Sequence, residues 1–272
     1  MSHSRKSALI NVMVQAAEKA GRELARDFGE VENLQISQKG PQDFVSCADT
    51  RAEETLQYEL SKARPNFGFL MEERGVVEGK DPARRFIIDP LDGTKNFLHG
   101  IPHCAVSIAA EENGKITAGV VHNPMTGEIY WAERGVGAFL NNVRLECTKT
   151  NALKNAFVGT GTPRLKGASE IAGVMPLVGG LRRMGSAALD ICLVAAGKAD
   201  GYWARDIEIW DIAAAKIILT EARGRFTDIK LGKDDCANEG NYLATNGHIH
   251  QDLRQLLLNL SKNNQKTEKV AS

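Results

Sequence analysis

A short apolar strand that runs directly into two aspartates constrains this chain more than any other feature. Residues 86–88 (Phe-Ile-Ile) have the composition of a buried strand, and residues 89–94 (Asp-Pro-Leu-Asp-Gly-Thr) follow without a break. Ligands of open α/β sheets bind at the carboxyl ends of strands. Two carboxylates there must be paired, protonated or bound to a cation, because burying bare charge is costly, and oxygen ligands suit a hard cation such as Mg²⁺.

The turn after these aspartates offers free N–H groups and a hydroxyl, which suit a phosphate. Asp, Pro and Gly are also common in ordinary β-turns, so the segment alone leaves a purely structural interpretation open. Other acids follow the same pattern. Glu72 ends the apolar run 67–71, while Asp211 opens an apolar helix and Asp49 precedes another. Each of the last two has an alternative explanation as a helix cap.

Composition narrows the class of protein. The 272 residues allow one large domain or two intimate halves. With 34 basic and 34 acidic residues the formal net charge is +0, so we expect no direct nucleic-acid binding. The five scattered cysteines form no CxxC pair and fit buried free thiols in a reducing compartment. We find no signal-peptide core and no membrane-length apolar run, and therefore expect a cytoplasmic protein without membrane contact.

Apolar periodicity predicts helices over 7–28 and 49–63. In the second, Thr50 and Glu53 have capping-box spacing, and Ala52, Leu56 and Leu60 form the buried stripe. Residues 38–43 are predicted to form a loop. The middle of the chain is rich in strands, with turns at 113–114 and 123–127. The predicted strands are 67–71, 85–88, 104–110, 116–122 and 128–133.

From about residue 150 strands alternate with helices. Helices are predicted at 186–196, 212–223 and 250–260, and a strand at 242–244. We expect an α/β fold of two closely packed α/β halves, without a hinge-like linker. The N-terminal half spans 1–150 and carries most of the candidate ligands, and the C-terminal half spans 151–260. The polar tail 261–272 is expected to be disordered.

Several motifs together resemble the inositol monophosphatase family, part of the lithium-sensitive, metal-dependent sugar phosphatases. The motifs, in order, are Gly-Pro-x-Asp-Phe-Val-x-x-Ala-Asp at 40–49, Glu-Glu at 72–73, Asp-Pro-Leu-Asp-Gly-Thr at 89–94, Gly-Ser-Ala-Ala at 185–188 and Trp-Asp at 210–211. The resemblance extends from residue 7 to about 260. It implies a five-layer α/β/α/β/α fold, a homodimer, and Mg²⁺-dependent hydrolysis of inositol monophosphate to inositol and phosphate.

The resemblance also implies a ligand set for two to three Mg²⁺ ions, with Ca²⁺ or Li⁺ as inhibitors. Glu72, Asp89 and the Leu91 carbonyl would bind the first ion, and Asp89, Asp92 and Asp211 the second. Glu72 would share a third ion with water. These are the oxygen ligands that Mg²⁺ prefers.

The remaining roles carried over from the family concern substrate and water. Gly93 and Thr94 would hold the phosphate through backbone N–H groups. Thr94 and Glu72 would orient and deprotonate the attacking water, and Asp49 would hydrogen-bond the Thr94 hydroxyl. The substrate-contacting positions would be Asp92, Gly93, Thr94, Gly185, Ser186, Ala187 and Asp211. Metal ions about 3.5–4 Å apart can activate a water and stabilise the leaving oxygen, so we expect in-line attack by water without a phosphoenzyme.

Three positions depart from the family pattern. Lys95 stands where the family has Thr or Ser, and Gln38, next to Lys39, aligns with a loop lysine. Ala204 stands where inositol-preferring members have a glutamate that bonds a substrate hydroxyl, and a site without that acceptor discriminates less strongly. The substrate could therefore be another polyol, sugar or histidinol phosphate. A further alternative is a bacterial regulatory relative that acts through transcription or RNA-processing partners.

Overall fold

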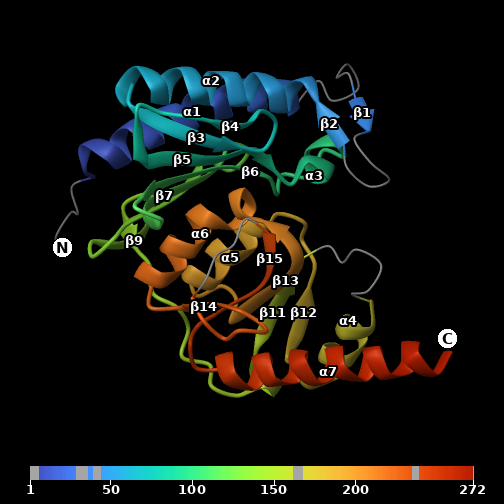
Figure 1. Cartoon of the computed structure of the whole chain (residues 1–272). Coiled ribbons are helices and arrows are strands. Elements are labelled where there is room, and N and C mark those ends of the chain that lie inside the picture. Colours follow the sequence, from blue (N-terminus) through green and yellow to red (C-terminus); the bar gives the residue numbers. More distant parts are fainter. Residues whose placement is uncertain (1–5, 29–35, 39–43, 162–167, 235–238, 272) are drawn as a thin grey trace.

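Helices and sheets alternate in five layers (Figure 1). The computed structural model describes residues 6–28, 36–38, 44–161, 168–234 and 239–271. One outer layer holds α1 (Ala8–Phe28) and α2 (Cys47–Ala63), and the central layer holds α5 (Ala187–Ala195) and α6 (Ile209–Glu221). The other outer layer holds α4 (Ala168–Val174) and α7 (His250–Ala271), with one sheet on each side of the central helices. The expected α/β/α/β/α arrangement is confirmed.

The larger sheet has eight strands within the described residues, in the order β10-β9-β8-β7-β6-β5-β3-β4. Its neighbours pair antiparallel except β3 with β5, which are parallel. The strands are β3 (Phe67–Met71), β4 (Gly75–Val77), β5 (Asp81–Asp92), β6 (Ala105–Glu112), β7 (Lys115–Asn123), β8 (Glu128–Glu133), β9 (Gly137–Leu140) and β10 (Val143–Arg144).

The smaller sheet is mixed, with the order β12-β11-β13-β15-β14 among the residues described. Its strands are β11 (Phe157–Thr160), β12 (Gly180–Arg182), β13 (Gly201–Glu208), β14 (Arg225–Asp228) and β15 (Glu239–Thr245). The remaining elements are the hairpin β1 (Ile36–Gln38) and β2 (Phe44–Ser46), the short helix α3 (Thr94–Leu98), and 3₁₀ turns at Leu153–Asn155 and Met175–Leu177.

Most of the predicted elements are confirmed, with ends that move by a few residues. The strands predicted at 67–71 and 128–133 coincide with β3 and β8. In the turn at 113–114 both Asn113 (φ 51°) and Gly114 (φ 72°) are left-handed, as a tight hairpin turn requires. Within the predicted loop 38–43, Gln38 ends β1, and residues 39–43 lie outside the described part of the chain.

The predicted capping box of the second helix is wrong. α2 already begins at Cys47, so Thr50 lies inside the helix. The buried Glu53 carboxylate instead accepts hydrogen bonds from the backbone N–H groups of Glu73 (2.9 Å) and Arg74 (3.1 Å), in the turn between β3 and β4. Glu53 therefore ties α2 to the segment that carries Glu72. The buried stripe of Ala52, Leu56 and Leu60 is confirmed.

The expectation of a disordered tail from residue 261 also needs correction, because α7 continues to Ala271. The tail contains no Gly or Pro that would end the helix. Its first residue is anchored, since the Ser261 hydroxyl bonds to Leu257 O (2.9 Å) and to Glu170 Oε1 (3.0 Å). None of the helices in the described residues has the length and apolarity that a membrane crossing requires.

The buried core is continuous across the sequence halves. α5 and α6 come from the second half, yet they pack on the larger sheet through residues such as Ile87, Ala109 and Val121. The chain passes from one sheet to the other between β10 and β11, and the predicted boundary near residue 150 falls in this passage. The division into two halves remains a prediction. The four described cysteines are free thiols, three of them buried.

Candidate metal and phosphate site

A bulge in β5 turns Asp89 and Asp92 toward the same side of the larger sheet. Side chains three residues apart on a regular strand face opposite ways. Here the register shifts between the two aspartates, so that Asp89 pairs with Ser107 and Asp92 with Ala105. The extra residue restores a common orientation. The Ser107 hydroxyl donates to Trp210 O (3.2 Å), which identifies the shared side as the one covered by α6.

Two further acids reach this place from other elements. Glu72 follows β3, and its backbone N–H donates to Ile88 O (3.3 Å), so it lies beside the end of β5. Asp211 is the third residue of α6. Its Oδ2 accepts the Glu208 N–H (3.2 Å), and the Glu208 carboxylate caps the same turn in return. The sequence left open whether Asp211 is a cap or a ligand, and its position allows both roles.

Asp89, Asp92 and Asp211 form one cluster, with one carboxylate oxygen of each within 4.8 Å of the others. Burial, followed by repulsion from Glu72, raises the pKa of Asp89 well above its usual range. Burial, followed by repulsion from Asp92, does the same to the pKa of Asp211. Burial raises the pKa of Asp92 to about 6, although hydrogen bonds from Ser186 and Ala188 favour its charged form. Raised pKa values mean that these carboxylates lose their protons less readily in the absence of a cation, and that binding of a divalent cation would favour their ionised forms.

The Gly93-Thr94 turn lies directly after the cluster. Gly93 is left-handed (φ 91°), and an added Cβ would approach His103 O to 3.0 Å and Ser186 Cβ to 3.3 Å. Only glycine suits this conformation without strain. The Thr94 hydroxyl donates to Leu91 O (3.0 Å), and the Leu91 N–H donates to Asp89 Oδ1 (2.9 Å). Residues 89–94 therefore form one hydrogen-bonded unit.

The start of α5 closes the other side of Asp92. The Ser186 hydroxyl (2.6 Å) and the Ala188 N–H (2.7 Å) both donate to Asp92 Oδ2, which leaves Oδ1 available to a cation. Gly185 precedes them with φ 95°, and Ala187 is the first residue of the helix. The predicted Gly-Ser-Ala segment thus borders the acidic cluster.

Three further positions named by the sequence analysis are Asp49, Lys95 and Ala204. Asp49 is buried in the first turn of α2, and its bond to the Thr94 hydroxyl remains a prediction. Lys95 is exposed on α3. Ala204 is buried in β13, where a Cβ added to Gly161 would lie 3.0 Å from the Ala204 Cβ.

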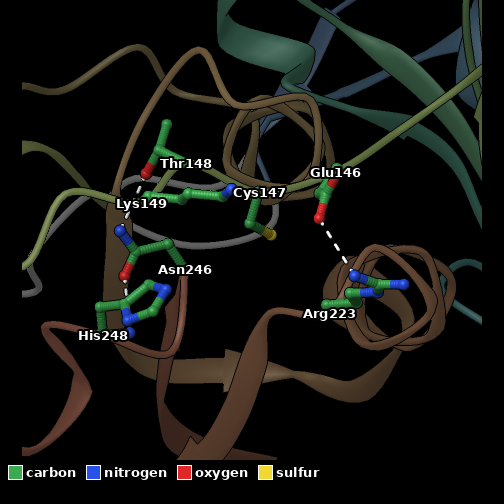
Figure 2. Close-up of a pocket in the computed structure, with 7 residues that line it drawn as sticks. All are labelled: Glu146, Cys147, Thr148, Lys149, Arg223, Asn246 and His248. Carbon is green, nitrogen blue, oxygen red and sulfur yellow. Dashed lines mark hydrogen bonds and ion pairs between the residues drawn. The ribbon is translucent and has the colours of Figure 1, made fainter.

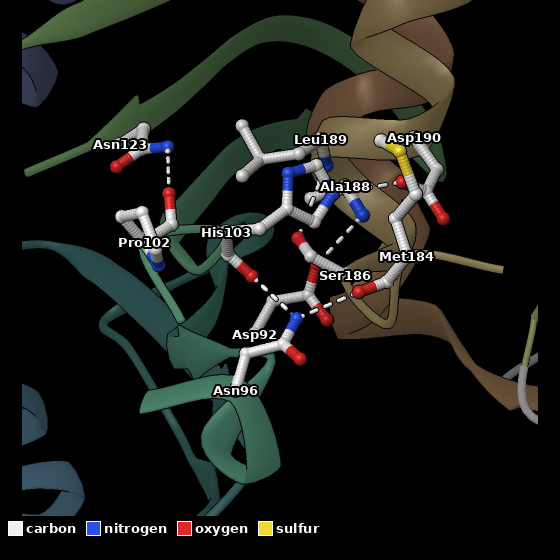
Figure 3. Close-up of polar contacts among 10 residues, drawn as sticks. All are labelled: Asp92, Asn96, Pro102, His103, Asn123, Met184, Ser186, Ala188, Leu189 and Asp190. Atoms are coloured by element: carbon white, nitrogen blue, oxygen red, sulfur yellow. Dashed lines mark hydrogen bonds and ion pairs between the residues drawn. The ribbon is translucent and has the colours of Figure 1, made fainter. Parts of the chain in front are cut away.

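Sequence reasoning did not predict the contacts that join the two sides of the site (Figure 3). Asn96 donates both to His103 O (2.7 Å) and to Met184 O (2.8 Å), and His103 Nε2 lies 2.8 Å from Asp190 Oδ1. No spacing rule links positions separated by almost ninety residues. The only available signal was the place of Asn96 and His103 just after the 89–94 segment.

The donor set fits a hard divalent cation. All side-chain donors are carboxylates, the two buried ones have raised pKa values, and the Leu91 carbonyl lies between them in sequence. Soft ligands are not part of this cluster among the described residues, which disfavours zinc or copper.

A separate cavity of about 260 Å³ lies at the opposite end of α6 (Figure 2). Its polar side chains largely satisfy one another. Arg223 pairs with Glu146 (3.2 Å), and the Asn246 amide donates to Thr148 Oγ1 (2.8 Å). None of the acidic-cluster residues lines this cavity, so it is not part of the candidate site.

Comparisons with known proteins agree with this geometry. The model of the "Inositol monophosphatase family" matches residues 5–266. An "Inositol-1-monophosphatase" of Rhizobium meliloti is 53% identical over 93% of this chain and 97% of that protein. A "Nus factor SuhB" of Vibrio cholerae is 39% identical over 87% of this chain and 91% of that protein.

Solved structures show the same relationship. The extragenic suppressor protein suhB of Bartonella henselae superposes with a TM-score of 0.89 at 52% identity, covering 92% of this chain and 98% of that one. An IMPase of Thermotoga maritima gives 0.88 at 33% identity, covering 94% and 99%. The chain therefore belongs to the inositol monophosphatase family, a family of phosphoric monoester hydrolases.

Proposed function

We propose that this protein hydrolyses a small phosphate monoester in a Mg²⁺-dependent reaction, with inositol monophosphate as the first candidate substrate. The observation that carries the proposal is the cluster of buried Asp89, buried Asp92 and half-buried Asp211, each with a carboxylate oxygen within 4.8 Å of the others, next to the Gly93-Thr94 turn. A phosphate dianion repels the carboxylates of the cluster, and it also repels the lone pair of an attacking water. Cations bound between the cluster and the substrate would remove this repulsion.

Glu72, Asp89, Asp92, Asp211 and the Leu91 carbonyl would hold the metal ions. Bound Mg²⁺ supplies charge neutralisation and a lowered pKa of the attacking water. The backbone N–H groups of Gly93 and Thr94 bind the phosphate oxygens. Glu72 is exposed, whereas Asp89 is buried, so Glu72 is the acid best placed to pass a proton to solvent.

Thr94 and Glu72 orient and deprotonate the attacking water, with Asp49 behind the threonine hydroxyl. The mechanism needs no side-chain nucleophile. Direct in-line attack predicts inversion of configuration at phosphorus in isotopically labelled water. Retention of configuration would instead indicate a phosphoenzyme and refute this step.

Asp89→Asn tests the proposal. The amide keeps the shape of the side chain and an acceptor for the Leu91 N–H, but it is a poorer ligand. Wild-type activity with inositol monophosphate should require Mg²⁺. In Asp89→Asn, kcat/KM should fall by about 100-fold or more, which corresponds to a barrier increase of about 3 kcal/mol. Asp252→Asn, an exposed change on α7, is the matched control. Wild-type activity that is unaffected by chelators would refute the metal-dependent mechanism.

We expect the enzyme to accept a broad range of substrates, because Ala204 has no side-chain acceptor for a hydroxyl group of the substrate. The neighbouring Arg205 cannot replace it, because a guanidinium only donates hydrogen bonds, and it already donates two to Glu170 (3.2 and 2.7 Å). A panel of inositol, sugar and histidinol phosphates measures this range. Ala204→Glu should raise kcat/KM for inositol monophosphate in a folded variant. An unchanged value would make the missing acceptor irrelevant.

A second candidate function is regulatory binding to the transcription or RNA-processing machinery. It is favoured by the 39% identity with a relative named "Nus factor SuhB". Asp89→Asn in a host that lacks the wild-type gene separates the two functions. Loss of the cellular phenotype supports catalysis, and full retention supports partner binding. The expected homodimer and cytoplasmic location remain predictions, which sedimentation and fractionation can test.

A further inference from the structure

Asp92 is held by groups from the other side of the molecule. Both bonds to its Oδ2 come from the start of α5, from the Ser186 hydroxyl and the Ala188 N–H. An Asp92 that rotated would lose both bonds and turn its free oxygen away from Asp89 and Asp211. The position of the first turn of α5 therefore decides how Asp92 faces the site.

The turn before α5 is tightly packed against the segment after β5. Gly185 has φ 95°, and a Cβ added to it would approach the Asn96 amide nitrogen to 3.1 Å. That amide group donates to Met184 O on one side and to His103 O on the other. Asn96 thus bridges the two segments with one side chain, as Figure 3 shows.

His103 makes the second link between these segments. Its Nε2 lies 2.8 Å from Asp190 Oδ1, one turn along α5 from Ser186. The loop that carries His103 is itself fixed, because the Asn123 amide donates to Pro102 O (3.1 Å). An ionised Asp190 requires the proton on Nε2, so the ring donates and the carboxylate accepts.

The buried Asp190 carboxylate relies on His103 for its side-chain hydrogen bond. It is only 4% exposed, and its Oδ2 has no hydrogen-bond partner within the described residues. Burial raises the pKa of Asp190, while the His103 bond and the Gly185 N–H favour its charged form. The Asp190 N–H also donates to Ser186 O (2.9 Å), so Asp190 connects the His103 ring to the Gly185-Ser186 turn.

We propose that His103 and Asp190 form a positioning pair, which fixes the Gly185-Ser186 turn and thereby aims Asp92 into the metal site. Neither side chain hydrogen-bonds to Asp89, Asp92 or Asp211 within the described residues, and both act through the start of α5. The pair joins the segment after β5 to the central helix layer at the point where the ligand is oriented. The proposal rests on the proposed function only in taking Asp92 to be a metal ligand.

His103→Phe keeps the ring volume and removes the donor, whereas His103→Gln can still donate from its amide to Asp190. In the metal-free protein, amide hydrogen exchange of Ala188 should become about 10-fold faster in the Phe variant, because the turn loosens. Partners behind a metal ligand typically change metal affinity or activity by about 10–100-fold. We therefore expect the Kd for Mg²⁺ measured by calorimetry to rise, and kcat/KM to fall, by at least about 10-fold.

In the His103→Gln variant, Ala188 exchange, Mg²⁺ affinity and kcat/KM should return to within about threefold of the wild-type values. His248→Phe, an exposed change at the far cavity, is the control and should match the wild type in all three. Asp190→Asn is the second test if His103→Phe does not fold. Unchanged Ala188 exchange, Mg²⁺ affinity and kcat/KM in a folded variant that only has a lower Tm would overturn the proposal. If the wild type binds no Mg²⁺ and hydrolyses no phosphate, the proposed function fails, and the exchange measurement still decides the positioning role.

Discussion

Gly119 on β7 allows α6 to pack unusually close to the larger sheet. A Cβ added to Gly119 would lie 2.6 Å from Ala214 O and 3.0 Å from Ala214 Cα, both backbone atoms of α6. Backbone cannot rotate away as a flexible side chain can. The substitution Gly119→Ala must therefore separate the helix from the strand. Asp211, one turn before Ala214 on the same helix, is expected to move with it.

The size of the effect follows from these distances. Ordinary van der Waals contact begins near 3.4 Å, so the helix and strand must separate by about 0.8 Å. Overpacking of this kind costs about 1–3 kcal/mol of unfolding free energy. Catalytic groups need to be placed within about 0.5 Å, and a misplacement of about 1 Å costs about 100-fold. We expect kcat/KM to fall by about 10–100-fold through the displacement of Asp211.

Gly114→Ala is the matched control on the same hairpin. Gly114 has φ 72° with open space around it, so the new methyl group strains the turn by about 1–2 kcal/mol and displaces nothing. Urea unfolding measures the two stability losses, and Mg²⁺ titration with steady-state kinetics measures function. The reasoning is refuted if Gly119→Ala loses stability like Gly114→Ala yet keeps its kcat/KM and Mg²⁺ affinity.

Three further changes test other parts of the structure. Gly93→Ala should reduce kcat/KM by about 10-fold or more, because the left-handed turn has no room for a Cβ; unchanged kinetics would contradict this. Glu53→Gln should lower the urea-unfolding free energy by about 1–3 kcal/mol, because one amide oxygen cannot replace two carboxylate oxygens; an equal stability would show that this contact is dispensable. His250 is buried between the Thr227 and Thr245 hydroxyls, and burial lowers its pKa to about 4. The unfolded chain takes up this proton first, so stability should fall by about 3 kcal/mol between about pH 6.5 and pH 4, and His250→Gln should remove that part of the slope.

Local rules were sufficient for the helices and strands with strong periodicity. The stripe of Ala52, Leu56 and Leu60 identifies α2, because apolar residues spaced four apart lie on one face of a helix and all three are buried. The same rules failed at Glu53, whose spacing from Thr50 matches a capping box. Its partners come from the turn after β3, about twenty residues away, and a local pattern carries no information about such contacts.

Local rules also fail to predict how Asp89 and Asp92 come to face the same side of the sheet. Strand alternation would place Asp89 and Asp92 on opposite faces of the sheet, so a literal extension of the β5 pattern separates the two residues that the motif implies should cooperate. The bulge resolves the conflict, and Pro90 lies within it, where a residue without an N–H is tolerated. The motif therefore encodes a backbone irregularity as well as two ligands. Its spacing of three residues is understandable only once the neighbouring strand is in place.

The central helix layer explains why the site cannot be assigned to one half of the chain. α5 holds Asp92 from one side, while α6 carries Asp211 and covers the face toward which the bulge turns both aspartates. Each helix follows the larger sheet in sequence by many residues, but each packs against it in the same core. A cluster of like charges forms at this junction only because packing elsewhere stabilises it. The free energy of burying α5 and α6 is thus what holds the carboxylates close enough to bind a cation together.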